Sequence, residues 1–175
     1  VVDYWRQAGQ RGQWFSKDPA FDRDFHDRFL ALHLAAARRE LDDWATTPHG
    51  ALALLILLDQ IPRNVFRNSG HAFATDSLAL HYATSAIDAG HDAKIDASLR
   101  FFFYMPFEHS EAIADQDRAV ELFTALGNND LLGYANAHRD VIVRFGRFPH
   151  RNRALGRVNT PEEQARVAKI QQMTP

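Results

Sequence analysis

The sequence predicts an all-α fold, and three observations lead to this prediction. Apolar residues recur at the helical spacing of three and four, as in the stripe within residues 21–36. The dipeptides Asp18-Pro19, Thr47-Pro48 and Thr160-Pro161 each pair an N-cap residue with a proline suited to the first helical turn. No segment alternates cleanly between apolar and polar residues, and the sequence contains no Asn-Gly or Asp-Gly hairpin turn.

The length and the helix signals together predict one domain that covers residues 1–175. A chain of 175 residues buries about two-thirds of its unfolded surface when it folds as one domain. No linker-like stretch divides the chain. We therefore expect a single all-α domain of roughly seven or eight helices.

The first predicted helices begin at capping residues. Asp18 precedes the apolar stripe of residues 21–36, and Thr47 precedes the apolar run of residues 51–58. The leucine and alanine content of that run favours a buried helix over a buried strand. Proline cannot donate to a helical hydrogen bond, so Pro62 is expected to end or kink this helix.

The later helices are expected between a capping residue and a stop signal. They are the helix from Thr75 to Gly90, residues 96–104 before Pro106, residues 111–126 between Ser110 and Gly127, the helix from Asp130 to Gly146, and a last helix after Thr160. In the last of these, Glu163 completes a capping box with Thr160.

The composition excludes several classes of function. The formal net charge is −2, whereas proteins that bind nucleic acid usually carry a clear positive excess, so no nucleic-acid partner is expected. The absence of cysteine excludes disulfides, thiolate metal sites and a cysteine nucleophile. The longest apolar run, residues 51–58, is far shorter than the roughly 20 residues that span a bilayer. With no signal peptide visible, we expect a cytoplasmic protein without a membrane partner.

The most informative motif is a short sequence that occurs twice. Residues 61–64 read Ile-Pro-Arg-Asn and residues 148–152 read Phe-Pro-His-Arg-Asn, and each copy follows an apolar helical stretch. Further arginines lie nearby, Arg67 after the first copy and Arg147 before the second. Two helix ends that both present arginine and asparagine side chains predict two walls of one polar site.

Three longer segments resemble one known protein family. They are residues 57–67 (Leu-Leu-Asp-Gln-Ile-Pro-Arg-Asn-Val-Phe-Arg), residues 103–111 (Phe-Tyr-Met-Pro-Phe-Glu-His-Ser-Glu) and residues 138–152 (His-Arg-Asp-Val-Ile-Val-Arg-Phe-Gly-Arg-Phe-Pro-His-Arg-Asn). Together they resemble the bacterial family designated domain of unknown function (DUF) 924. The chain departs from the family pattern at Glu108, where methionine is usual, and after Glu163, where a polar tail replaces an apolar one.

The resemblance implies an all-α fold of the tetratricopeptide-like kind, which is a right-handed stack of antiparallel helix pairs. It implies no reaction and no catalytic residues, because no activity is established for the family.

His138 is the first candidate catalytic residue. Leu131, Ala135, His138 and Ile142 fall on one face of the helix that is expected to end at Gly146. A histidine within an apolar stripe is either a core residue with hydrogen-bonded ring nitrogens or an acid, base or ligand that points into a pocket. The spacing leaves both interpretations open.

The loop after Gly146 carries the second candidate, His150, among several arginines. The candidate ligand-binding residues of the two copies are Arg63, Asn64, Arg67, Arg147, Arg151 and Asn152. Guanidinium groups that lie close together repel one another unless an anion or carboxylates neutralise them. Acids such as Asp59, Asp76 and Asp140 would form a structural network of ion pairs, whereas a bound phosphate or carboxylate would make a ligand site.

His109, Glu111 and Asp115 form a weaker candidate, a partial set of metal ligands. Glu111 and Asp115 lie one helical turn apart, but their spacing does not match the zinc pattern His-Glu-x-x-His. We therefore expect no metal. The sequence also contains no phosphate-binding loop and no dinucleotide fingerprint, so no cofactor is expected.

Three functions are compatible with these residues. The first is a site for a small anionic molecule, a phosphate ester or carboxylate, with His138 or His150 available as an acid or base if a reaction is catalysed. The second is a tetratricopeptide-like scaffold that binds a peptide or protein in a groove. The third is a purely structural role for the charges. The first is favoured as a statement about binding, because the unusual residues gather at two helix ends.

Overall fold

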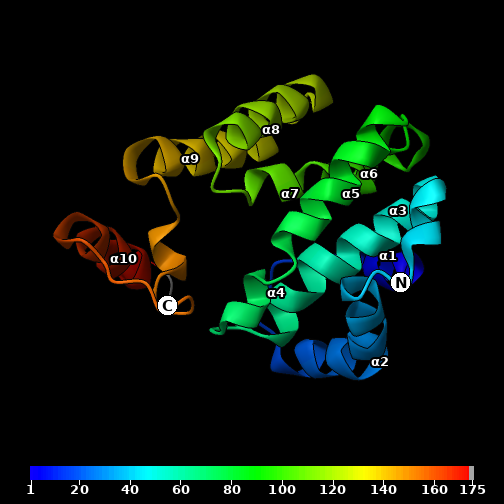
Figure 1. Ribbon diagram of the computed structural model, residues 1–175, viewed down its shortest axis with the longest axis horizontal. Coiled ribbons are helices and arrows are strands. Elements are labelled where there is room, and N and C mark those ends of the chain that lie inside the picture. Colours follow the sequence, from blue (N-terminus) through cyan, green and yellow to red (C-terminus); the bar gives the residue numbers. More distant parts are fainter. Residues whose placement is uncertain (174–175) are drawn as a thin grey trace. The chain divides into compact units, whose positions relative to one another are not determined.

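The computed structural model describes residues 1–173 and confirms the all-α fold (Figure 1). Among these residues every regular element is helical. The chain divides into two compact units. The first unit comprises residues 1–67 and 71–107, and the second comprises residues 68–70 and the chain from Glu108 onward. The single domain over residues 1–175 stays a prediction.

The first unit contains helices of very different lengths, from the 4 residues of α6 to the 19 residues of α2. Its α-helices are α1 (Val2–Gln10), α2 (Pro19–Ala37), α3 (Pro48–Leu55), α4 (Ile61–Val65), α5 (Asp76–Asp88), α6 (Ala97–Arg100) and α7 (Met105–Glu108), the last of which ends on the first residue of the second unit. Helices of 3₁₀ type cover Asp42–Thr46, Gly70–Phe73 (whose first residue belongs to the second unit), Asp92–Lys94 and Phe101–Phe103, and a π-helix covers Ile56–Gln60.

The predicted helix starts at Asp18 and Thr47 are confirmed. The Asp18 carboxylate accepts hydrogen bonds from the backbone N–H groups of Ala20 and Phe21, at 2.9 and 3.2 Å. The Thr47 hydroxyl accepts one from the backbone N–H of Gly50 at 3.1 Å. In both helices the proline that follows occupies the first turn, where its missing N–H has no helical partner to lose.

Helix α3 is buried from Ala51 to its end at Leu55, which explains the continuous apolar sequence of this part. The side chains of Leu52, Leu54 and Leu55 are buried almost completely. Beside them lies an aromatic cluster in which Trp5 of α1 stacks on Phe25 of α2 with ring centroids 5.2 Å apart. A helix that is apolar on every side is stable only in an interior, so the predicted buried helix is confirmed.

Pro62 does not end this helix, which corrects that part of the prediction. The α3 helix, the π-helix and α4 follow one another without interruption from Pro48 to Val65, with Pro62 inside the run. Proline lacks an N–H, and its ring collides with the carbonyl four residues earlier. The chain accommodates it with a wider turn, in which the Ile61 N–H reaches back five residues to the carbonyl of Ile56.

The wider turn releases backbone carbonyls, and side chains from other helices satisfy them. The Leu57 carbonyl accepts a hydrogen bond from Nδ1 of His33 on α2 at 2.8 Å. The Leu58 carbonyl accepts one from the Thr75 hydroxyl at 2.5 Å. Thr75 precedes α5 as predicted, but its hydroxyl serves this carbonyl and caps no helical N–H. Proline in the buried helix therefore ties α2 and α5 to it.

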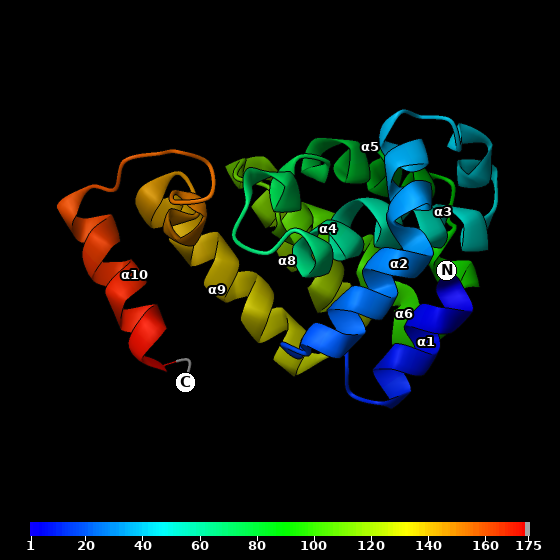
Figure 2. The same ribbon diagram turned by 90° about the horizontal axis from the view of Figure 1, so that it is seen from below.

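The described part of the second unit contains three helices of 13 to 17 residues. They are α8 (Ile113–Leu126), α9 (Asn129–Phe145) and α10 (Pro161–Met173), with a 3₁₀ turn at Pro149–Arg151. Helices α8 and α9 pack against each other and form a helical hairpin through a short connection. Figure 2 shows the segment that joins α9 to α10, in orange, at the C-terminal end of α9. The tetratricopeptide-like stacking implied by the family resemblance stays a prediction.

The ends of these helices confirm some capping predictions and correct others. Gly127 and Gly146 both take the left-handed conformation expected of a helix stop. The predicted cap at Asp130 is wrong, because the Asn128 side chain caps α9. The predicted cap at Ser110 is also displaced, since α8 begins only at Ile113.

The capping box at the start of α10 is confirmed. Glu163 accepts a hydrogen bond from the Thr160 N–H at 2.7 Å, and the Thr160 hydroxyl accepts one from the Glu163 N–H at 3.2 Å. Across the described residues, none of the helices has the length and apolar character that a membrane crossing requires.

The released carbonyl of Leu58 gives a test of this arrangement. Replacing Thr75 by valine removes the hydroxyl donor and leaves the buried carbonyl unsatisfied, so we expect Thr75→Val to lower the free energy of unfolding by about 1–3 kcal/mol. Thr124→Val is the matched control, because the Thr124 hydroxyl donates to a carbonyl of its own helix on the exposed surface. Its expected change is within about 0.5 kcal/mol. Equal losses in urea unfolding of the two variants would contradict the assigned role.

Candidate functional site

The first copy of the repeated motif is held by carboxylates of its own unit. The Arg63 guanidinium makes a bidentate pair with Asp76, at 2.9 and 3.0 Å, and lies 3.1 Å from the carboxylate of Asp59. It also donates to the backbone carbonyl of Asp59 at 2.7 Å, and Asp59 is part of the π-helix. Asp59 and Asp76 thus neutralise Arg63, as the structural interpretation expects.

The other two residues of that copy share one acid. Arg67 donates to both carboxylate oxygens of Asp22 on α2, at 2.7 and 3.0 Å. The Asn64 amide donates to Asp22 at 2.9 Å. These contacts join the end of α4 to α2 within the first unit, so the first copy forms polar side-chain contacts between two helices.

Two histidines, His33 and His71, lie close to the same helices. Nδ1 of His33 donates to the Leu57 carbonyl, and Nε2 of His33 lies 3.2 Å from Nε2 of His71. Because one of these two Nε2 atoms must accept, the neutral form of His33 fits the geometry. Burial is the main cause that holds the pKa of His33 below its ordinary value. The hydrogen bond to the Leu57 carbonyl raises this pKa, and the nearby His71 lowers it further.

In the second unit, Arg147 is also paired with a carboxylate. Its guanidinium makes a bidentate pair with the buried Glu163, at 2.6 and 2.9 Å. The hydrogen bond from Arg147 and the backbone N–H of Thr160 lower the pKa of Glu163 to about 2. Asn152 is buried next to them and donates to Asn159 at 2.7 Å. The predicted ligand groups Arg147 and Asn152 therefore help to fasten α10 to the loop that follows α9.

Glu111 holds the start of the same loop. It accepts a bidentate pair from Arg157, at 2.7 and 2.9 Å, and a hydrogen bond from the Phe148 N–H at 2.8 Å. Burial raises the pKa of Glu111, but these donors outweigh it and leave the pKa below its ordinary value. Asp140, which the sequence analysis named among the neutralising acids, does not join these pairs. Arg144 of α9 pairs with Glu162 of α10.

The three weak metal candidates do not act together. Glu111 is occupied by Arg157, and Asp115 accepts a hydrogen bond from the Ser110 hydroxyl at 2.5 Å. Within residues 1–173, no three histidine or acidic side chains stand where they could hold a metal ion. The arrangement of His109, Glu111 and Asp115 is thus a set of helix and loop contacts.

Arg151 is buried behind the loop. Its guanidinium lies over the Phe148 ring, 4.5 Å from the ring centroid, and donates to the backbone carbonyl of His109 at 2.9 Å. Only 6% of the residue is exposed. Arg151 therefore supports the aromatic ring from one side, and its charge acts on neighbouring groups from within the unit.

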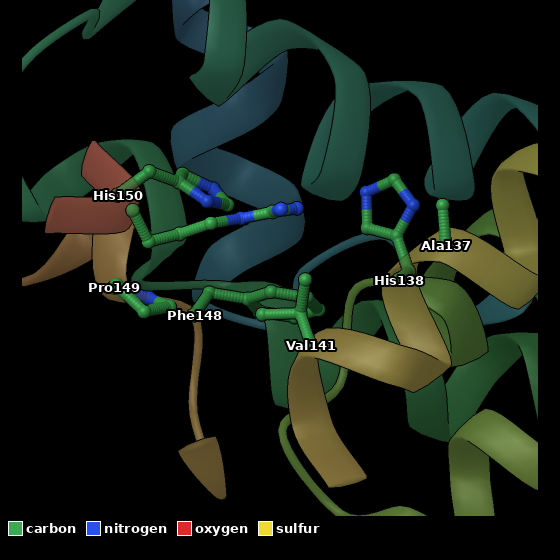
Figure 3. Close-up of a pocket in the computed structure, with 7 residues that line it drawn as sticks. Ala137, His138, Val141, Phe148, Pro149 and His150 are labelled. Carbon is green, nitrogen blue, oxygen red and sulfur yellow. The ribbon is translucent and has the colours of Figure 1, made fainter. Parts of the chain in front are cut away.

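The loop and two helices form a pocket. It has a volume of about 170 Å³ and is lined by Ala137, His138, Val141, Phe148, Pro149, His150 and Arg166. Figure 3 shows the imidazoles of His138, from α9, and His150, from the 3₁₀ turn, on the same side of Val141 and Phe148. His138 and Phe148 meet edge to face with centroids 5.6 Å apart. The structure thus brings both candidate catalytic histidines to one pocket.

Glu108 orients His138. Nδ1 of His138 lies 2.7 Å from a carboxylate oxygen of the buried Glu108 and 2.9 Å from the Tyr134 carbonyl. Both neighbours are acceptors, so Nδ1 carries a proton and the remaining nitrogen, Nε2, is the one that titrates. Burial lowers the pKa of His138, but the hydrogen bond and charge of Glu108 outweigh it and raise the pKa above its ordinary value.

The chemistry of the pocket follows from this orientation. A protonated His138 donates a hydrogen bond from Nε2 and carries a positive charge; a neutral one accepts a proton there. About a third of the His138 side chain is exposed. The interpretation of His138 as a core histidine therefore fits less well than that of a pocket residue.

Two residues of the pocket region were missed by sequence reasoning. Glu108 carried one signal, the departure from the family pattern, but nothing in the sequence placed it opposite His138. Arg166 follows the capping box of α10 by less than one turn, and its position at the pocket depends on the packing of α10 beside the 3₁₀ turn.

Comparison with known proteins gives a family and a fold. The family model described as a bacterial protein of unknown function, DUF924, matches residues 1–170. A solved structure of a protein of unknown function from Agrobacterium tumefaciens is 52% identical to this chain, with a TM-score of 0.92. The match covers 96% of this chain and 94% of that chain. No curated protein matches. The comparisons thus support the all-α fold and name no ligand or reaction.

The turn that leads into the pocket loop gives one prediction. Gly146 has a φ of +66°, and an added Cβ would meet no atom within 4 Å. Gly146→Ala should therefore cost only backbone strain, about 1–2 kcal/mol of the free energy of unfolding. Gly133→Ala is the matched control, because Gly133 lies within α9 with equally open space and should stabilise by about 0.5–1 kcal/mol. The same sign for both variants in urea unfolding would contradict the assignment.

The two perturbed histidines should have opposite effects on pH dependence. The folded pKa of His33 lies below its unfolded value of about 6.5, so the unfolded chain binds more protons and stability falls as the pH drops below that value. His33→Gln should lose less stability than the parent protein between about pH 7 and 5. The folded pKa of His138 lies higher, so its contribution is complete below about pH 6.5 and is lost as the pH rises through the folded pKa.

His138→Gln should accordingly lose less stability than the parent protein between about pH 6 and 8. Thermal unfolding followed by circular dichroism across both intervals checks the two variants. A variant whose pH profile runs parallel to that of the parent protein would show that its histidine keeps an ordinary pKa.

Proposed function

We propose, for a chain that belongs to the bacterial family of unknown function DUF924, that the pocket of the second unit binds a small oxyanion. The ligand class is a carboxylate or a phosphate ester. One observation carries the proposal: His138, His150 and Arg166 line the pocket, and none of its lining residues is a carboxylate. Such a set of donors and positive charges matches an oxyanion.

The ion pairs of other arginines support Arg166 as the arginine that binds the anion. Arg63, Arg67 and Arg147 are each held by a carboxylate of their own unit, so their charge is already balanced. Arg166 is exposed and, within residues 1–173, makes no ion pair. Its guanidinium can therefore meet a ligand without first giving up a carboxylate.

The size and walls of the pocket narrow the ligand. The volume of about 170 Å³ lies below the roughly 300–1,000 Å³ of pockets that hold drug-sized molecules. Val141, Phe148 and Pro149 provide an apolar wall, which suits a short hydrocarbon portion. The proposal covers binding, and acid–base catalysis by His138 or His150 stays a prediction from the sequence.

Thermal unfolding with a panel of small anions tests the proposal. The panel contains acetate, inorganic phosphate, sulfate and short phosphate monoesters, each compared at the same ionic strength at about pH 6. A ligand at 100 times its dissociation constant should stabilise the protein by about 2.7 kcal/mol. For a chain of this size, that corresponds to a rise in Tm of roughly 5–10 °C.

Two arginine variants decide where the anion binds. Arg166→Gln should weaken the best ligand about tenfold or more, because it removes a charged hydrogen bond. Arg153→Gln makes the same change in charge at an exposed residue outside the pocket and should leave the affinity within about twofold. Equal effects of the two variants would place the binding elsewhere. A rise in Tm with peptides alone would favour the scaffold function.

A further inference from the structure

We propose that the pocket takes up its anion together with a proton, which Nε2 of His138 carries, and that Glu108 sets the pH range of this coupling. The inference rests on the proposed function and adds its regulation. A site of this kind binds its ligand at lower pH and releases it as the pH rises.

The hydrogen bonds of His138 place the exchangeable proton in the pocket. Nδ1 is fixed by two acceptors, the Glu108 carboxylate at 2.7 Å and the Tyr134 carbonyl at 2.9 Å. Among the side chains of residues 1–169, which the structure describes, none forms a hydrogen bond with Nε2. A proton that His138 gains is therefore gained at Nε2, on a side chain that lines the pocket.

The groups around His138 have opposite effects on its protonation. They are Glu108 from α7, His109 with its ring centroid at 6.5 Å, Arg151 behind Phe148, His150 and Arg166 at the pocket, and Arg139 and Asp140 on α9 itself. Arg139 is balanced by Asp117 of α8. Glu108 favours the imidazolium through a short hydrogen bond, whereas Arg151 opposes it.

Glu108 is a positioning residue in this scheme. It is 5% exposed and does not line the pocket, so it acts on the ligand only through His138. The raised pKa of His138 agrees with this arrangement. Without the carboxylate, burial and Arg151 would both oppose the charge, and the imidazole would stay neutral to lower pH.

Binding and protonation must then strengthen each other. An anion in the pocket stabilises the imidazolium, and the imidazolium raises the affinity for the anion by the same factor. Above the pKa of the free histidine, binding requires uptake of a proton. If the neutral form binds negligibly, the dissociation constant rises about tenfold for each pH unit.

Isothermal titration calorimetry with sulfate tests the coupling. Sulfate keeps its double charge throughout the range from about pH 5.5 to 8.5, so any proton that is taken up comes to the protein. Measurement in two buffers with different ionisation enthalpies gives the number of protons. We expect uptake that approaches one proton per sulfate above the pKa of His138, and none well below it.

Three variants assign the coupling to its residues. Glu108→Gln should shift the pH profile of sulfate affinity to lower pH while the lowest-pH affinity stays within about threefold of the parent. His138→Gln should remove this part of the pH dependence, and any dependence that His150 adds is measured in His150→Gln. Glu121→Gln, at an exposed acid on α8, is the matched control and should leave the profile unchanged.

A measurement on the unaltered protein covers the case in which Glu108→Gln fails to fold. The pKa of His138, followed by NMR of its ring carbons, should rise when sulfate is added. Sulfate binding without a pH dependence, or an unchanged pKa of His138, overturns the coupling and leaves the proposed function standing. An unshifted profile in folded Glu108→Gln overturns the role of Glu108. Binding of neither sulfate nor phosphate at any pH overturns the proposed function itself.

Discussion

The first unit depends on one missing hydrogen-bond donor, the absent N–H of Pro62. In a buried helix, an unsatisfied carbonyl cannot turn to water, so each carbonyl that proline releases must find a donor from the protein. His33 and Thr75 supply these donors to Leu57 and Leu58. They come from outside the buried helix, so the same constraint that widens the helix also specifies which neighbours pack against it.

In the second unit, the comparable constraint is charge. Its arginines could not gather around one loop without partners, and Glu111, Glu162 and Glu163 provide them. Each of these pairs fastens α10 or the loop to the rest of the unit. What the pairing leaves uncompensated is therefore informative. Arg166, which forms no ion pair within the described part of the chain, lines the pocket together with His138, whose Nδ1 is held by Glu108.

The fold could be predicted where the determinant is local. A cap such as Asp18, a left-handed glycine such as Gly146 and the box of Thr160 and Glu163 are all decided within a few residues, so the sequence predicts them well. The course of the chain at Pro62 could not be predicted in this way. Its continuation depends on donors far away in the sequence, and a proline with no such donors would have ended the helix.

The candidate site was predicted in part for the same reason. The two copies of Pro-Arg-Asn look alike, yet Pro62 lies within a helix and Arg63 is claimed by two aspartates, while Pro149 opens a 3₁₀ turn that carries His150 to a pocket. A short motif predicts the local conformation of the backbone, but it does not predict which residues its side chains will contact. The sequence pointed to His138 within an apolar helical stripe and to His150 in a loop, and both side chains line the pocket, whereas a catalytic role for either stays a prediction. Glu108 could be assigned only from the structure, since its effect on His138 depends on a separation of 2.7 Å that no spacing in the sequence encodes.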